Sequence, residues 1–140
     1  DVFKLKQRLN EAIMTEWSRR WSDTTKGQHT KLFFPTIHAR QMAEWVEADH
    51  WCTQLLSGHG AFSAKLHFFR RSPSPRCATC PDEDEDALHV LLRCPAHDGP
   101  RLRLMRTIHK YDPEPADLVA TREGFGALLE FSKYWRSIRA

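Results

Sequence analysis

Three cysteines and a histidine within 18 residues form the group in this sequence with the clearest chemical potential. They are spaced as Cys77-x2-Cys80-x8-His89-x4-Cys94. Two cysteines two residues apart can turn both sulfurs onto one ion, and the eight-residue loop lets the chain return with two further ligands. Thiolate and imidazole groups in a set of four are typical of tetrahedral Zn²⁺. The spacing therefore predicts a zinc site.

The spacing alone leaves the fourth ligand open. Cys94-x2-His97 would form a second knuckle, so His97 could replace His89 in the set. Two other interpretations are weaker: free thiols beside a surface histidine, and a redox Cys-x-x-Cys pair, for which no strand-helix context is present. Cys52 lies 25 residues upstream beside Trp51, and we expect it to be a small core residue.

We expect the metal to be structural. A catalytic zinc keeps three protein ligands and one open position, whereas four ligands here fill the shell. Five acids at positions 82–86 are expected to form a solvated loop tip, and Arg76 and Arg93 could offset the negative charge of three thiolates. We found neither a glycine-rich phosphate loop nor a nucleophile motif, so we expect no catalytic residues in this fragment. Ser57-Gly58-His59-Gly60 is interpreted as a structural turn, with His59 hydrogen-bonding across it.

Composition and charge limit the possible partners. A chain of 140 residues is one domain, or one domain with a small satellite, and five Trp and eight Phe can fill a core. The formal net charge of +3 includes five negative charges at 82–86, which leaves +8 for the remainder and favours a polyanionic partner. No run is apolar and long enough to cross a membrane. Because the chain begins at Asp1, we expect it to be a fragment of a longer protein.

The elements that must position these residues are mostly helical. The apolar spacing predicts helices over 2–21, 39–56 (possibly two), 61–70, 87–93, from Pro100 onward, and 122–138, with 31–34 as a strand or extended segment. The expected fold is a small, mostly α domain with an inserted Cys-Cys-His-Cys knuckle. We divide it into an N-terminal helical part (1–70), the knuckle (71–99) and C-terminal helices packing on the same domain (100–140).

Several residues together resemble one family. They are Trp17 and Trp21 with Thr25-Lys26-Gly27 and Thr30, then Gln54-Leu-Leu-Ser-Gly-His-Gly60 with Phe62, Leu66-His67 and Phe69, and finally Ser74-Pro75 before the cysteines with Ala87-Leu-His89, Leu92 and Cys94-Pro95. This combination, over about 17–95, resembles the C-terminal segment of non-LTR (LINE-type) retrotransposon reverse transcriptases. Residues 96–140 carry no recognisable likeness, and Ser57 stands where Thr is more usual.

The resemblance implies a zinc knuckle formed by Cys77, Cys80, His89 and Cys94. It also implies binding of element RNA or target DNA during target-primed reverse transcription, in the nucleus or cytoplasm, as part of a larger polyprotein that carries the polymerase. Basic side chains expected to contact the nucleic-acid backbone are Arg70, Arg71, Arg76, Arg101, Arg103 and Arg106. Phe68 lies off the helical face of its neighbours and is a candidate for base stacking, although the more usual place for such a ring is the core. The alternative is a structural or protein-interaction module, possibly domesticated, in which zinc only stabilises the fold.

Overall fold

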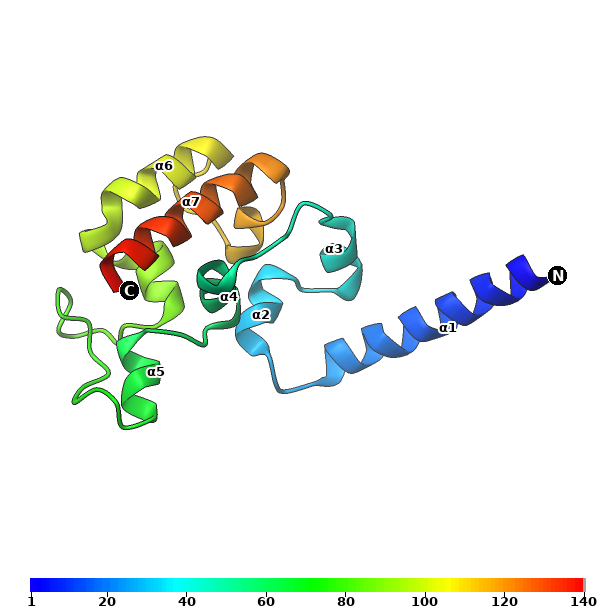
Figure 1. Cartoon of the computed structure of the whole chain (residues 1–140), viewed down its shortest axis with the longest axis horizontal. Helices are drawn as coiled ribbons and strands as arrows, with labels where there is room; N and C mark the ends of the chain where they lie inside the picture. The colour runs from blue at the N-terminus through cyan, green and yellow to red at the C-terminus, as the bar shows by residue number, and fades with distance from the viewer. Residues whose placement is uncertain (140) are drawn as a thin grey trace.

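A computed structural model describes residues 1–139, and Ala140, the last residue of the expected C-terminal part, lies outside the described range. The described chain is helical, as predicted, and contains no strand. Its elements, drawn in Figure 1, are α1 (Val2–Asp23), α2 (Gln28–Phe33), α3 (Ile37–Met42), α4 (His50–Ser57), α5 (Ser63–Phe68), the π-helical turn η1 (His89–Arg93), η2 (Pro95–His97), α6 (Asp98–Ile108), η3 (Pro115–Leu118) and α7 (Arg122–Arg139).

Helix α1 forms where the spacing predicts it, but its apolar face has no partner. Asp1 caps it by accepting a 2.9 Å hydrogen bond from the Phe3 N–H. The helix projects away from the rest of the molecule (Figure 1), and the side chains of Leu5 and Leu9 are 68% and 58% exposed. The apolar face that the spacing predicts is therefore uncovered by the described chain for most of its length. Only its C-terminal end joins the body, where the Trp21 indole N–H donates to the Phe34 carbonyl at 3.0 Å.

The segment expected as a strand or extended run is instead the end of α2. Phe33 is a helical residue and Phe34 caps the helix, donating its N–H to the Thr30 carbonyl at 3.0 Å. Both rings are buried. The run Lys31-Leu-Phe-Phe34 was too short to separate a buried helical turn from a strand by periodicity alone.

The segment expected as one or two helices forms two, α3 and α4. The Thr36 hydroxyl caps α3 by accepting from the Ala39 N–H at 3.0 Å, and Asp49 caps α4 by accepting from the Cys52 N–H at 2.7 Å. Helix α4 ends at Gly58, which has a left-handed φ of 76° that favours glycine. Side-chain oxygens at helix N-caps satisfy backbone N–H groups that the helix cannot pair, which explains both boundaries.

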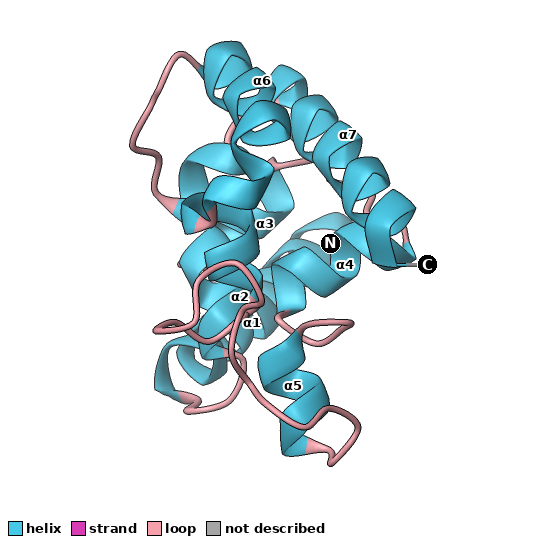
Figure 2. Cartoon of the chain, turned by 90° about the vertical axis from the view of Figure 1, so that its left-hand side faces the viewer, coloured by secondary structure: helices cyan, strands magenta, loops and turns pink. Residues whose placement is uncertain are grey.

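The core is shared by distant parts of the chain. Helices α6 and α7 lie side by side (Figures 1 and 2), and α4 contacts α7. Phe62, from just before α5, stacks on Trp135 of α7 with ring centroids 5.4 Å apart. One hydrophobic cluster contains residues from 33–62, 87–91 and 104–135. All three predicted parts therefore contribute to a single core. None of the described helices is both long and apolar enough to span a membrane.

Candidate metal centre

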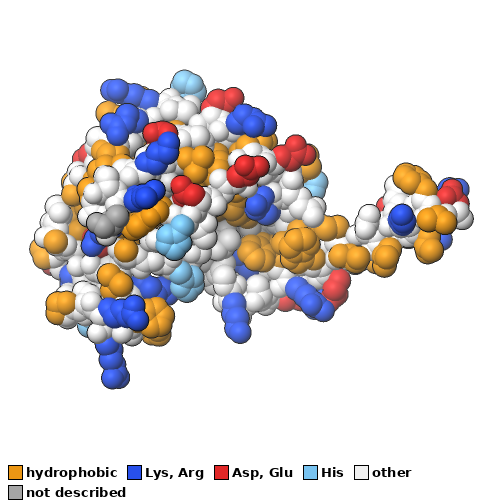
Figure 3. Space-filling model, in the orientation of Figure 1, with side chains coloured by type: hydrophobic (Ala, Val, Ile, Leu, Met, Phe, Trp, Pro, Cys, Tyr) orange, Lys and Arg blue, Asp and Glu red, His pale blue; other side chains and the backbone are white. Residues whose placement is uncertain are grey.

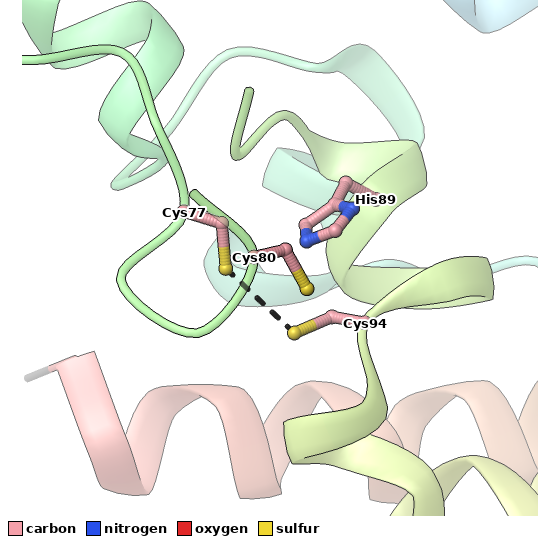
Figure 4. A group of neighbouring side chains, drawn as sticks. All are labelled: Cys77, Cys80, His89 and Cys94. Carbon is pink, nitrogen blue, oxygen red and sulfur yellow. Dashed lines mark hydrogen bonds between the residues drawn. The ribbon is translucent and has the colours of Figure 1, made fainter. Parts of the chain in front are cut away.

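The structure brings Cys77, Cys80, His89 and Cys94 together (Figure 4). One ligand atom from each of the four side chains can be chosen so that all lie within 4.8 Å of one another. Cys77, His89 and Cys94 are buried, and Cys80 is partly exposed. The three sulfurs and the imidazole point toward a common centre, with Cys77 and Cys80 on the loop and the other two at the start and just beyond the end of η1.

The geometry fits a tetrahedral metal ion. With metal–sulfur bonds of about 2.3 Å, two sulfurs of a tetrahedral site are about 3.8 Å apart. The Sγ atoms of Cys77 and Cys94 are 3.8 Å apart. A disulfide would need about 2.05 Å, and all four cysteines are free. Both ring nitrogens of the fully buried His89 lack a hydrogen-bond partner among the described residues, an arrangement that a metal ligand would explain.

Backbone hydrogen bonds hold the cysteine loop in a tight knuckle. The Cys77 N–H donates to the Glu83 carbonyl at 2.9 Å, and the Glu83 N–H donates to the Cys80 carbonyl at 3.0 Å. Arg76 and Asp84 form an antiparallel β-bridge across the loop. These bonds turn the cysteine sulfurs toward the same side as η1.

Burial disfavours the thiolate form of the ligands. It raises the pKa of the Cys94 thiol to about 11 and also raises the pKa of Cys80. Metal ligation requires thiolates, so binding a cation here would release protons.

Arg101 is structural, which corrects its prediction as a nucleic-acid contact. Its side chain is buried, with 4% exposure of the residue, and its guanidinium donates to the carbonyls of Val90, Leu91 and Cys94 at 2.7–2.9 Å. Asp98 accepts a further bond at 2.8 Å. Arg101 thus ties α6 to the chain on either side of the last metal-ligand candidate, because a π-helical turn leaves carbonyls that need donors. A charge pattern cannot distinguish such a buried arginine from an exposed one.

Four of the five acids at 82–86 are exposed, as expected of a solvated loop, but Glu85 is buried, and Glu83 and Asp86 lie next to His89. Glu85 is 5% exposed and accepts hydrogen bonds from the Ser63 N–H and hydroxyl at 3.0 and 3.1 Å, and from Arg139. Glu83 places a carboxylate oxygen 3.1 Å from His89 Nδ1, in a direction that does not make a hydrogen bond. Asp86 accepts from the His89 N–H at 2.8 Å. These roles depend on residues up to 54 positions away, so the run alone gave no signal for them.

The alternative ligand His97 and the fourth cysteine, Cys52, lie outside the cluster. His97 shares a 2.6 Å hydrogen bond between its Nδ1 and the Tyr134 hydroxyl, and its ring packs edge-on against Trp135. Burial, followed by the positive charge of Arg101, lowers its pKa. Cys52 is a fully buried residue of the hydrophobic core, as expected, and burial raises its pKa to about 12.

The other predicted basic residues are exposed. Arg70 and Arg71 follow α5, and Arg76 precedes Cys77, where it donates to the Asp82 carbonyl at 3.1 Å and lies 3.4 Å from Asp84. Arg103 and Arg106 are on α6, which lies at the opposite end of the body from α5 in both views (Figures 1 and 2). The two sets therefore occupy different parts of the surface and do not form the single strip that the sequence suggested.

The fold and the site together define a small helical module organised around a buried Cys3His cluster that can hold a metal ion. No protein-family model matches the chain, and no solved structure matches it. Curated relatives do match. The chain is 35% identical over 130 residues, 90% of its length, to the Retrovirus-related Pol polyprotein from type-1 retrotransposable element R1 4 of Nasonia vitripennis.

Two further curated relatives are also Pol polyproteins of type-1 retrotransposable elements. Over 98 residues, 70% of the chain, it is 34% identical to the corresponding polyprotein of element R1 2 from Nasonia vitripennis and 31% identical to that of element R1 from Bradysia coprophila. The chain spans 33%, 24% and 10% of these three relatives. The chain therefore matches one segment of the Pol polyproteins of R1-type non-LTR retrotransposons.

Proposed function

We propose that this segment is a zinc-stabilised nucleic-acid-binding module of a retrotransposon Pol polyprotein that is a reverse transcriptase. It would contact element RNA or target DNA during target-primed reverse transcription, in the nucleus or cytoplasm, while the polymerase chemistry belongs to other parts of the polyprotein. The observation that carries this proposal is the buried Cys3His cluster in a chain whose relatives are retrotransposon Pol polyproteins.

The metal would hold the fold rather than perform chemistry. Four protein ligands complete a tetrahedral shell, so a substrate or water would have no open position. Three thiolates favour Zn²⁺ over cations that prefer oxygen ligands. By pinning the knuckle to η1, the ion would fix Arg70, Arg71 and Arg76 around α5 and the loop, where they could neutralise phosphates.

Metal analysis separates the two candidate ligand sets. We expect one zinc per chain by elemental analysis, loss of zinc in His89→Ala, and retention of zinc in His97→Ala. His97→Ala should lower the melting temperature through the lost Tyr134 contact while leaving the metal content unchanged. Retention of zinc in His89→Ala would assign the fourth ligand elsewhere.

Nucleic-acid binding is tested by titrating labelled single-stranded RNA and duplex DNA at two salt concentrations. Binding should weaken as salt rises, because phosphate contacts release counterions. Charge reversal at Arg70, Arg71 and Arg76 should weaken binding with little change in melting temperature, since these side chains are exposed. Arg103→Glu and Arg106→Glu form a matched pair on the other part of the surface. Absence of binding at low salt would refute the proposal.

The exposed face of α1 favours a second candidate, a module that docks to protein. Its large apolar side chains recur every three or four residues and are about half exposed or more; they are Val2, Leu5, Leu9, Ile13 and Trp17. A contiguous stripe of this kind is typical of a protein-binding helix. The relatives are much longer than this chain, so the rest of the polyprotein is the natural partner. Retained zinc without nucleic-acid binding would favour this alternative.

A further inference from the structure

A cavity of about 410 Å³ adjoins the metal cluster at Asp86, and the rest of its lining takes no part in that cluster. It is lined by the chain before and at the start of α2 (27–29), the turn after α4 (57–59), α5 and the residues just before it, and positions 86–87. The volume is in the range of pockets that hold small organic groups, about 300–1,000 Å³. Both sequence motifs that lie outside the knuckle, Thr25-Lys26-Gly27 and Ser57-Gly58-His59-Gly60, contribute to it.

The turn Ser57-Gly58-His59-Gly60 lines the cavity, and its backbone leaves little freedom at its two glycines. Gly58 has a φ of 76°, and a Cβ on Gly60 would lie 2.2 Å from Gln54 Oε1 and 2.6 Å from Gln54 Cβ. The bond across the turn is made by the backbone N–H of His59, which donates to Ser57 Oγ at 3.2 Å, and not by the ring as expected. The turn therefore presents an exposed imidazole at the edge of the cavity.

Helix α5 contributes an aromatic ring with a cation beside it to the lining. Phe68 is 74% exposed, the largest exposed fraction among the large hydrophobic residues described. The Lys65 ammonium lies 5.8 Å from the centroid of its ring, and both side chains line the cavity. The end of the molecule that bears α5 shows hydrophobic and basic side chains together (Figure 3). An exposed aromatic face next to a cation is the arrangement on which unpaired bases stack.

We propose that this cavity receives one unpaired nucleotide of a single-stranded nucleic acid. The base stacks on Phe68, the Lys65 ammonium contacts a phosphate, and His59 hydrogen-bonds to the base or sugar. Arg70 and Arg71 follow directly on the chain and continue the backbone contacts. This inference rests on the proposed function and names the part of the surface that receives a single strand.

The one acidic side chain among the lining residues does not oppose an anionic ligand strongly. Asp86 accepts from the His89 N–H at 2.8 Å and lies 3.6 Å from the Arg93 guanidinium, so its charge is partly offset. The mixed polar and aromatic lining also suits a nucleotide better than a purely apolar peptide side chain.

The test uses short single-stranded RNA and DNA oligonucleotides that carry one 2-aminopurine, whose fluorescence falls when the base stacks. With the wild-type chain we expect quenching on binding. Phe68→Ala should abolish the quenching and weaken single-strand binding by about fivefold or more, which corresponds to one lost base–aromatic stack. Phe68→Trp should retain both. Tyr111→Ala, which removes another exposed aromatic residue (67% exposed) outside the cavity, should leave both unchanged.

Different outcomes separate the two proposals. Unchanged quenching and affinity in Phe68→Ala would overturn the cavity assignment while the binding function stood. An equal loss of affinity for blunt duplex DNA would also overturn it, because a paired base cannot enter the cavity. If the wild-type chain bound no oligonucleotide at low salt, the proposed function would fail first. Circular dichroism should show that Phe68→Ala melts like the wild type, since the exposed side chain adds little to folding.

Discussion

Single residues in this protein derive their importance from what lies against them rather than from their type. Gly60 illustrates this, because its backbone is not left-handed and yet the position has no room for a side chain. Gln54 occupies that space, accepting a hydrogen bond from the Ala61 N–H at 3.0 Å through Oε1. Gly126, in the interior of α7, has open space around it.

These two glycines should respond in opposite directions to the same substitution. Gly60→Ala should destabilise the fold by about 1–3 kcal/mol, because the new Cβ displaces a buried Gln54. Gly126→Ala should be neutral or stabilise by up to about 1 kcal/mol, because alanine favours a helix interior. Urea unfolding of both variants measures the difference. A Gly60→Ala variant as stable as the wild type would show that the turn is looser than the structure indicates.

At the scale of elements, Arg101 connects α6 to η1. Arg101→Met should cost at least about 3 kcal/mol, because three carbonyls of Val90, Leu91 and Cys94 lose a charged donor. Arg103→Met, an exposed neighbour on the same helix, should change stability by no more than about 0.5 kcal/mol. Thermal melts of the two variants provide the comparison. Similar losses in both would contradict the assigned role of Arg101.

Helix α1 allows a second test at this scale. Leu5→Ala and Leu9→Ala should change the free energy of unfolding by no more than about 0.5 kcal/mol, because both side chains are already in contact with solvent. Leu55→Ala, the same substitution in the core, should cost about 2–5 kcal/mol. A large loss in the α1 variants would mean that this face is covered in solution.

For the whole molecule, we expect a metal ion at the cluster and the helical core to contribute separately to stability. The cluster's four candidate ligands lie on the knuckle loop and at the two ends of η1, whereas the core joins α2, α4, α6 and α7 through residues such as Leu55, Leu104 and Trp135. Chelation at neutral pH should therefore lower the melting temperature but retain most of the helical circular dichroism signal.

Counting the reactive thiols during chelation tests whether the metal site and the helical core contribute separately to stability. Cys77, Cys80 and Cys94 should become reactive toward a disulfide reagent, while Cys52 should stay protected, because it is fully buried and its pKa is raised to about 12. Reaction of all four thiols, or loss of the helical signal, would show that the core cannot form without the ion.

The sequence by itself determined the features that depend on neighbours along the chain. Helical periodicity predicted α1, helix within 39–56 as one or two segments, and the final helix, since amphipathic spacing is a local property. The ligand spacing predicted that Cys77, Cys80 and Cys94 could meet with one histidine, because a short loop and one helical turn place them together, but it left His89 and His97 open as the fourth member. Residues 31–34 were too few for periodicity to identify a helix.

Tertiary structure alone decided which charges and apolar faces are buried. Arg101 and Arg106 look alike in sequence, but only Arg101 meets the open carbonyls around η1. Glu85 resembles the acids beside it and is nevertheless held by Ser63 and Arg139. The apolar stripe of α1 predicts burial, yet nothing in the described chain reaches most of it. Burial depends on contacts between distant segments, which local spacing does not encode.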